Sequence, residues 1–285
     1  MISQEEIKFF SLLGALFSLG MGACVGSFLN VCIWRLPRGE SIVSPGSHCP
    51  KCNSPIPWYC NIPVLSWCCL RGRCLRCKAP ISIRYTIVEL LTAALFLAAG
   101  ISWLAPEMLA LTPALSICVV PCRWLVISGL VVGTFIDLKH FILPDSITIG
   151  GMAAGVLLSV FVPGLHGCAT PLEALRVSLT GMATGFGLLY AIGWLGSKAF
   201  KKDAMGFGDV KLMGAIGAFF GWQAVLFVVF VSSFIGSVAG VVLMACGRAK
   251  RASRIPFGPY LAAAALIWMF WGARLVEMYL SLMRR

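Results

Sequence analysis

Charged residues are scarce in this chain of 285 residues. Asp, Glu, Lys and Arg make up only 12% of it, about half of what a soluble domain typically carries. Hydrophobic residues make up 59%, and several apolar runs approach the ~20 residues of a membrane-spanning helix. The short alternating strands of a transmembrane barrel are missing. The composition therefore predicts an all-α polytopic membrane protein.

Several signatures of other protein classes are absent as well. The opening stretch MISQEEIKFF lacks the basic region of a cleaved signal peptide. The sequence holds no P-loop, no GxGxxG fingerprint and no HExxH helix. Only three histidines occur, and no Ser/His/Asp set falls on one predicted face. These absences argue against nucleotide-binding enzymes, zinc metalloproteases and serine hydrolases.

The apolar runs predict about eight transmembrane helices. The sixth run is short, and only FFGWQA separates it from the seventh, so a total of seven or a re-entrant sixth helix also fits. The runs cover residues 10–34, 86–104, 114–136, 146–164, 174–196, 210–222, 223–246 and 257–280.

The basic residues predict the orientation of these helices. Net charge is +12, but 17 of the 23 Lys and Arg residues fall in alternate connections, as the positive-inside rule expects of cytoplasmic loops. Topology thus explains the charge, and nucleic acid is not an expected partner. Both termini are predicted outside the cytoplasm. The four basic connections are 35–84, 137–145, 198–211 and 247–256.

Residues 35–84 form the longest connection and are predicted to be a small cytoplasmic lobe. Two pairs in it, CPKC and CLRC, have the spacing of metal ligands, and two such turns complete a tetrahedral zinc site. Metal binding would supply the folding free energy that so small a core lacks. The predicted ligands are Cys49, Cys52, Cys74 and Cys77.

Other interpretations of the lobe stay open. A redox role or a loop without metal is the alternative, whereas disulfides are disfavoured in a reducing compartment. Three further cysteines, Cys60, Cys68 and Cys69, leave other pairings open, and His48 adjoins the first pair. No internal repeat stands out.

Acidic residues number only eleven. Asp137 ends the third apolar run and Asp209 begins the sixth, so the topology places both at one membrane depth. Acids there are costly and usually functional. Two carboxylates that share a site can activate a water between them, as in aspartic proteases. Gly206 and Gly208 beside Asp209 would allow positive φ and a close approach of another chain, the extended segment of a substrate.

A structural interpretation of the acids competes with this one. Asp209 and Asp145 could cap helices while Asp137 pairs with Lys139 or Lys211. A proton or ion relay is a third interpretation. A lone GxGD motif is too weak to decide among them.

Five motifs in one order give a more specific signal. They are GSFLNVCIWRLPRGE at 26–40, the cysteine-rich stretch at 49–90, IDLKHFILPDSIT at 136–148, GFGDVKLMGAIGAFFGW at 206–222 and IPFGPYLA at 255–262. With them the chain resembles the bacterial prepilin peptidases, or type IV leader peptidases, which are GxGD-type membrane aspartyl proteases. The resemblance spans nearly the whole chain.

The resemblance implies an enzyme of the bacterial inner membrane. It would cleave the basic leader of type IV prepilins or type II secretion pseudopilins after a glycine, at the cytoplasmic face. The implied catalytic pair is Asp137 and Asp209, and the implied cysteine motif is the four-cysteine set above. Many members then methylate the new amino terminus with S-adenosylmethionine, for which segment 26–40 and the lobe are the plausible places.

The resulting prediction has three parts: a first transmembrane helix at 1–34, the cysteine lobe at 35–84 and a membrane-embedded protease core at 85–285. Asp145 is interpreted as the N-cap of the fourth span, with a direct substrate role as the alternative. Lys139 and Lys211 would tune the acids or, more simply, contact lipid phosphate. The rival functions are a proton-coupled transporter, which needs no cysteine lobe, and a non-catalytic assembly scaffold, which needs no paired acids.

Overall fold

The computed structural model describes the whole chain except residues 1–3, 104–112, 202–204, 248–255 and 285. Most of the predicted basic connection at 247–256 therefore lies outside the described residues. Within the described part the chain is helical, with no strand beyond two isolated bridges. Two units can be distinguished, residues 1–132 and 133–285.

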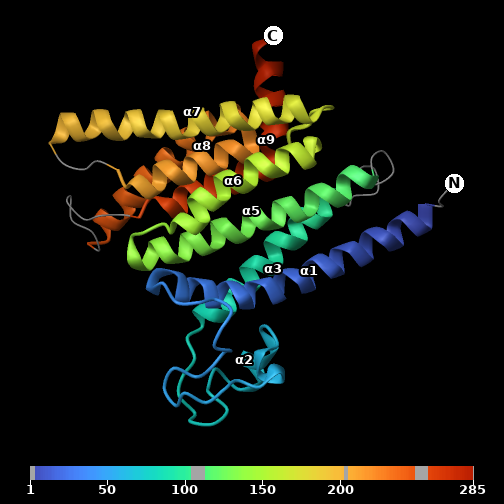
Figure 1. Cartoon of the computed structure of the whole chain (residues 1–285), viewed down its shortest axis with the longest axis vertical. Coiled ribbons are helices and arrows are strands. Elements are labelled where there is room, and N and C mark those ends of the chain that lie inside the picture. Colours follow the sequence, from blue (N-terminus) through green and yellow to red (C-terminus); the bar gives the residue numbers. More distant parts are fainter. Residues whose placement is uncertain (1–3, 104–112, 202–204, 248–255, 285) are drawn as a thin grey trace. The chain divides into compact units, whose positions relative to one another are not determined.

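The first unit is built on the long helices α1 (Gln4–Arg35) and α3 (Arg84–Trp103), which pack along each other. Helix α1 has acidic residues in its first turn and a basic residue in its last turn, which suits the helix dipole. Between them, residues 36–83 form a lobe of turns with two 3-10 helices, Leu36–Arg38 and Trp58–Asn61, and the short helix α2 (Leu65–Cys69). The lobe projects from the two long helices (Figure 1).

An aromatic core joins α3 to the first part of α5 (Pro113–His140). The ring of Trp124 stacks on Phe96 with centroids 5.0 Å apart, and its Nε1 donates to the Phe96 carbonyl at 3.3 Å. Phe17 of α1 lies against the same indole. Large aromatic side chains near the middle of each helix thus hold α1, α3 and α5 together.

The second unit contains the end of α5, then α6 (Asp145–Phe161), a 3-10 turn (Pro163–His166), α7 (Pro171–Phe200), α8 (Phe207–Ala245) and α9 (Gly258–Met283). Helix α8 packs against α6, α7 and α9. Thr170 caps α7, because its hydroxyl accepts the Glu173 amide. Helices α6, α7 and α8 lie side by side (Figure 1).

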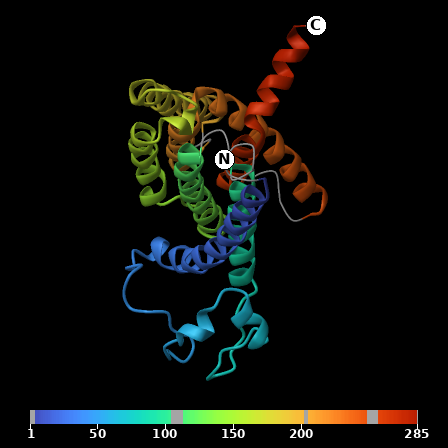
Figure 2. The ribbon, with the colours of Figure 1, turned by 90° about the vertical axis from the view of Figure 1, so that its right-hand side faces the viewer.

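Helix α8 is broken at Gly221, where φ is 78° and ψ is 177°. A straight helix would separate residues 213 and 225 by about 18 Å. Instead, a Cβ placed on Gly185 of α7 would lie 3.0 Å from the Met213 carbonyl carbon and 3.2 Å from Val225 Cγ2. The second part of α8 therefore folds back along the first, and the helix is visibly bent (Figure 2).

The prediction of an all-helical membrane protein agrees with this structure, but eight spans are not confirmed. The described residues contain five helices long and apolar enough to cross a membrane, or six if the bent α9 counts as one span. Helix α6 has only 17 residues. The predicted sixth and seventh runs belong to one helical element, although its break at Gly221 falls in the FFGWQA border.

Candidate active site and cysteine cluster

Asp137 lies in the last turn of α5, and its side chain is only 6% exposed. Its Oδ2 accepts a hydrogen bond from the Gly258 backbone amide at 3.0 Å. Gly258 is the first residue of α9, where backbone amides have no partner within the helix. The start of α9 therefore holds the Asp137 carboxylate in place.

Residue 258 has to be a glycine for this contact. A Cβ there would lie 2.7 Å from Asp137 Oδ2 and 3.3 Å from Cγ. Gly258 belongs to the motif IPFGPYLA but was predicted to have no role, because nothing in the sequence pairs it with a residue 121 positions away. Its place at the start of the predicted run 257–280 was the available signal.

Asp209 is the third residue of α8, after the N-cap Gly206. The helix dipole favours a carboxylate at this position. The Asp209 amide donates to the Gly206 carbonyl at 3.1 Å, but no side chain caps the helix. Capping, the structural alternative for Asp209, is therefore not what the structure shows.

One cavity of about 250 Å³ is lined by both Asp137 and Asp209, and their charges interact. The fold thus brings together two carboxyls that are 72 residues apart in the sequence. The remaining walls are the turn Phe141–Leu143 and the start of α8. A water held between two such carboxyls is the arrangement of aspartic proteases.

The two glycines of the GxGD motif act differently from the prediction. Gly206 has φ −68°, and positive φ, one of the two predicted reasons for these glycines, is not found at either of them. Gly208 is instead explained by a contact within this chain, because a Cβ there would lie 3.0 Å from Leu143 Cβ. The motif brings the turn after α5 against the start of α8.

Asp145 and Lys211 form an ion pair at the edge of the cavity, with Lys211 Nζ 2.6 Å from Asp145 Oδ1. The predicted capping role of Asp145 is wrong: Pro144 is the N-cap of α6, and no side chain caps this helix. Asp145, 63% exposed, reaches instead to Lys211 of α8, which is 18% exposed. Lys211 thus pairs with Asp145 and not with Asp137.

The four predicted metal ligands come together in the lobe. The Sγ atoms of Cys49, Cys52, Cys74 and Cys77 all lie within 4.8 Å of one another. Cys49 and Cys77, one from each pair, are 3.8 Å apart. Cys60, Cys68 and Cys69 lie outside this cluster, and His48 bonds to the Gly46 carbonyl. Four thiols at these distances can hold one metal ion.

The two cysteine turns are copies of each other, a repeat that was not predicted from the sequence. In each, the first cysteine amide donates to a carbonyl five residues on, Cys49 to Ser54 and Cys74 to Ala79. In each, the residue after the second cysteine has positive φ, 54° at Asn53 and 56° at Lys78. The shared pattern CxxCxxP was the available signal.

Hydrogen bonds in the two turns change the pKa values of the cysteine thiols. Two hydrogen bonds from Ser54 lower the pKa of Cys52 to about 6. The bond from the Ser54 hydroxyl has the larger effect and the bond from its backbone amide the smaller. Backbone amides of Cys77 and Arg76 lower the pKa of Cys74. Although the Ala79 amide favours the thiolate of Cys77, desolvation and the other three thiols raise its pKa to about 11. Thiolates are the form that binds metal.

Comparison with known proteins shows which family the chain belongs to. Residues 124–241 match the Type IV leader peptidase family, and residues 21–103 match the Bacterial Peptidase A24 N-terminal domain. No solved structure matches the chain.

Three relatives carry the name prepilin leader peptidase/N-methyltransferase. The Myxococcus xanthus protein is 43% identical over 244 residues, 85% of this chain and 67% of the relative. The Aeromonas hydrophila protein is 38% identical over 96% of this chain and 94% of the relative. The Pseudomonas aeruginosa protein is 34% identical over 92% and 91%. The chain therefore belongs to the type IV leader peptidase family.

Proposed function

We propose that this protein is a prepilin leader peptidase of the bacterial inner membrane that also N-methylates the amino terminus it creates. Its substrates are type IV prepilins or type II secretion pseudopilins, cut after the glycine that ends their basic leader. The observation that carries the proposal is the cavity lined by Asp137 and Asp209 at the ends of two apolar helices. Relatives named for both activities support it.

Cleavage follows from the two carboxyls. The substrate's extended segment enters the cavity, and a water lies between Asp137 and Asp209. The ionised carboxyl takes a proton from the water, which attacks the scissile carbonyl carbon, and the protonated carboxyl donates its proton to the carbonyl oxygen. Collapse of the tetrahedral intermediate breaks the C–N bond, and the leaving amine takes a proton from the pair. The Gly258 amide keeps Asp137 oriented throughout.

The ion pair between Asp145 and Lys211 has a positioning role in this mechanism. It links the first residue of α6 to the start of α8, two residues after Asp209. Ion pairs this exposed contribute about 0–1 kcal/mol, so Asp145→Asn should leave substantial cleavage. Complete loss in a folded variant would instead assign Asp145 a direct role with the substrate.

The membrane topology has eight passes in this proposal: α1, α3, α5, α6, α7, the two parts of α8, and α9. The reversal at Gly221 supports counting α8 twice. The positive-inside bias then places the cysteine lobe and the carboxyl pair at the cytoplasmic face. The functional parts remain residues 1–34, 35–84 and 85–285.

Zinc is the metal we assign to the four cysteines, because tetrahedral thiolate sites favour it. Its role is structural: it would tie together two turns of a lobe that has almost no buried core. S-adenosylmethionine is the methyl donor in this proposal, as the N-methyltransferase names of the relatives suggest.

The deciding experiment is cleavage of a prepilin by purified protein in detergent. We expect Asp137→Asn and Asp209→Asn to be folded and to lose cleavage by at least about 10³-fold. Glu277→Gln, an exposed acid near the end of α9, is the matched control and should cut normally. Normal cleavage by either aspartate variant would contradict the catalytic pair. A wild-type protein that cuts nothing would fit a transporter or a scaffold.

A further inference from the structure

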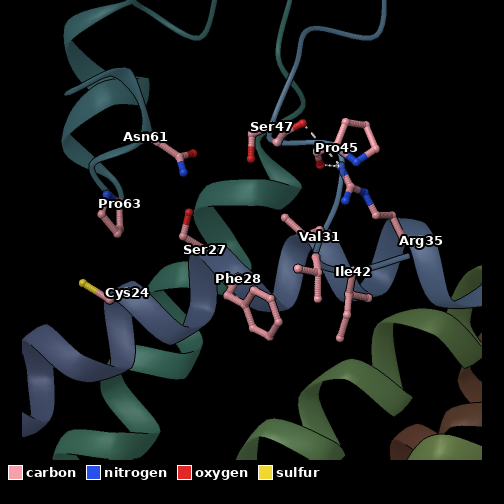
Figure 3. Close-up of a pocket in the computed structure, with 12 residues that line it drawn as sticks. Cys24, Ser27, Phe28, Val31, Arg35, Ile42, Pro45, Ser47, Asn61 and Pro63 are labelled. Atoms are coloured by element: carbon pink, nitrogen blue, oxygen red, sulfur yellow. Dashed lines mark hydrogen bonds between the residues drawn. The ribbon is translucent and has the colours of Figure 1, made fainter. Parts of the chain in front are cut away.

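A second cavity, of about 350 Å³, lies in the first unit, far along the chain from the catalytic aspartates. Its walls come from the second half of α1 and from the lobe loops 42–47 and 61–63 (Figure 3). Nothing in the peptidase mechanism uses it. Its volume falls within the range of small-molecule sites.

The lining of this cavity has an apolar side and a polar side. Phe28, Val31 and Ile42 form the apolar side, with the Phe28 ring 48% exposed. The side chains of Ser27, Ser47 and Asn61 extend toward the space from the other walls (Figure 3). An aromatic face with a few convergent polar groups is the usual recognition surface for a nucleoside.

One charged side chain, that of Arg35, belongs to the walls of the cavity. The guanidinium of Arg35, a residue only 6% exposed, donates to the carbonyls of Ser41 at 2.9 Å and Pro45 at 2.7 Å. These bonds use only some of its five N–H groups, and Arg35 still lines the cavity. It can therefore both shape the loop and attract a carboxylate.

A buried acid lies behind the opposite wall. Glu89 of α3 accepts the Val64 amide at 2.8 Å, and Val64 adjoins Pro63 of the cavity rim. A Cβ placed on Gly26, the neighbour of Ser27, would lie 2.8 Å from Glu89 Cα. A cation in the wall and an acid behind it suit a ligand that carries both signs.

We propose that this cavity binds S-adenosylmethionine. The adenine would lie against Phe28, the carboxylate of the methionyl group toward Arg35, and the cationic sulfonium on the Ser27 side, nearest Glu89. The inference rests on the methyltransferase part of the proposed function. The cavity also lies in the segment that matches the N-terminal domain of the family, apart from the segment with the aspartates.

The transfer needs no other co-reactant. The neutral α-amine of the cleaved pilin attacks the methyl carbon, a C–N bond forms and the C–S bond breaks. The bonding electron pair stays on sulfur, which leaves neutral S-adenosylhomocysteine. The methylated amine gives up one proton to water.

Binding of radiolabelled S-adenosylmethionine to the purified full-length protein tests the location directly. Phe28→Ala removes the apolar wall, and Ser47→Trp fills the space from the loop. Both should weaken binding about tenfold or more. The controls are Phe10→Ala, on the same helix, and Ser82→Trp, at an exposed site outside the cavity; both should bind within twofold of wild type.

Methyl transfer and prepilin cleavage are measured on the same preparations. In each cavity variant the fall in methylation should exceed any fall in cleavage by about tenfold, which separates a lost site from a misfolded protein. Unchanged binding in Phe28→Ala, or in a Ser47→Trp protein that still cuts, would overturn the location. A wild type that cuts but binds no S-adenosylmethionine would overturn the methyltransferase activity itself, and the inference with it.

Discussion

At the residue scale, the candidate site depends on contacts that are short and specific. Asp137 is held by one backbone amide from a helix more than a hundred residues later. Lys211, two residues after Asp209, is engaged by Asp145 and is therefore not a partner of Asp137. Gly258 and Lys211 are thus each explained by one contact with an acid from a distant segment.

Gly258→Ala tests the support of Asp137. The new Cβ would collide with Asp137 Oδ2, so the carboxylate must move and its hydrogen bond weakens. Because a hydrogen bond to a charged group contributes about 1.5–3 kcal/mol, we expect prepilin cleavage to fall roughly tenfold or more. Gly150→Ala, with open space around the new Cβ, is the control and should cut normally. Full activity of Gly258→Ala would rule out this support.

His166 should give stability a pH dependence. Burial lowers the pKa of His166, whose Nε2 lies 2.8 Å from Ser159 Oγ. The native state therefore prefers the neutral ring, and stability falls as pH drops from the ordinary value near 6.5 to the lowered native pKa, since the unfolded chain binds the proton first. Thermal unfolding in detergent measures this loss.

His166→Gln should flatten that slope below pH 6.5, while His48→Gln, at an exposed position, should not. The same slope in wild type and His166→Gln would show that other groups cause it.

At the element scale, helix ends place the chemistry. The catalytic candidates lie at the end of α5 and the start of α8, and the start of α9 supports them. The break at Gly221 is equally important, because it lets α8 fold back along itself beside α7. A continuous 39-residue helix would be about 58 Å long, nearly twice the hydrocarbon thickness of a bilayer.

Gly221→Ala should therefore destabilise the protein. The backbone at φ 78° and ψ 177° suits glycine alone, and a Cβ would also lie 3.1 Å from Val177 Cγ1. We expect a loss of about 1–3 kcal/mol, seen as a lower midpoint of thermal unfolding in detergent. Gly150→Ala serves again as the control and should be neutral or slightly stabilising. An unchanged midpoint for Gly221→Ala would mean that the break is not required.

At the scale of the whole molecule, the chain combines a membrane part that is rich in apolar core with a lobe that is not. Of the residues described in the lobe, Cys49 is among the very few that are buried. We therefore expect the fold of the lobe to depend on the cysteine cluster.

Metal analysis tests this dependence. The purified protein should contain about one zinc per chain, because four thiols form one cluster. Cys77→Ser should lose most of the metal and unfold at a lower temperature. Cys68→Ser, outside the cluster, should keep both metal and stability. A metal-free wild type of full stability would contradict a structural zinc site.

The class of the protein, both members of the carboxyl pair and the four clustered cysteines could be predicted from the amino-acid sequence alone. Apolar runs reveal helices because a bilayer requires them, CxxC turns are local, and acids are too rare in an apolar chain to be overlooked. Family resemblance then indicated the activity.

Contacts between segments that are distant in the sequence became known only from the folded chain. It showed that Gly258 supports Asp137, that Asp145 pairs with Lys211 instead of capping α6, and that α8 turns back at Gly221. The folded chain also revealed the cavity between α1 and the lobe. Such contacts are set by how helices pack, and packing leaves no periodic trace in the sequence from which a partner 66 or 121 residues away could be predicted.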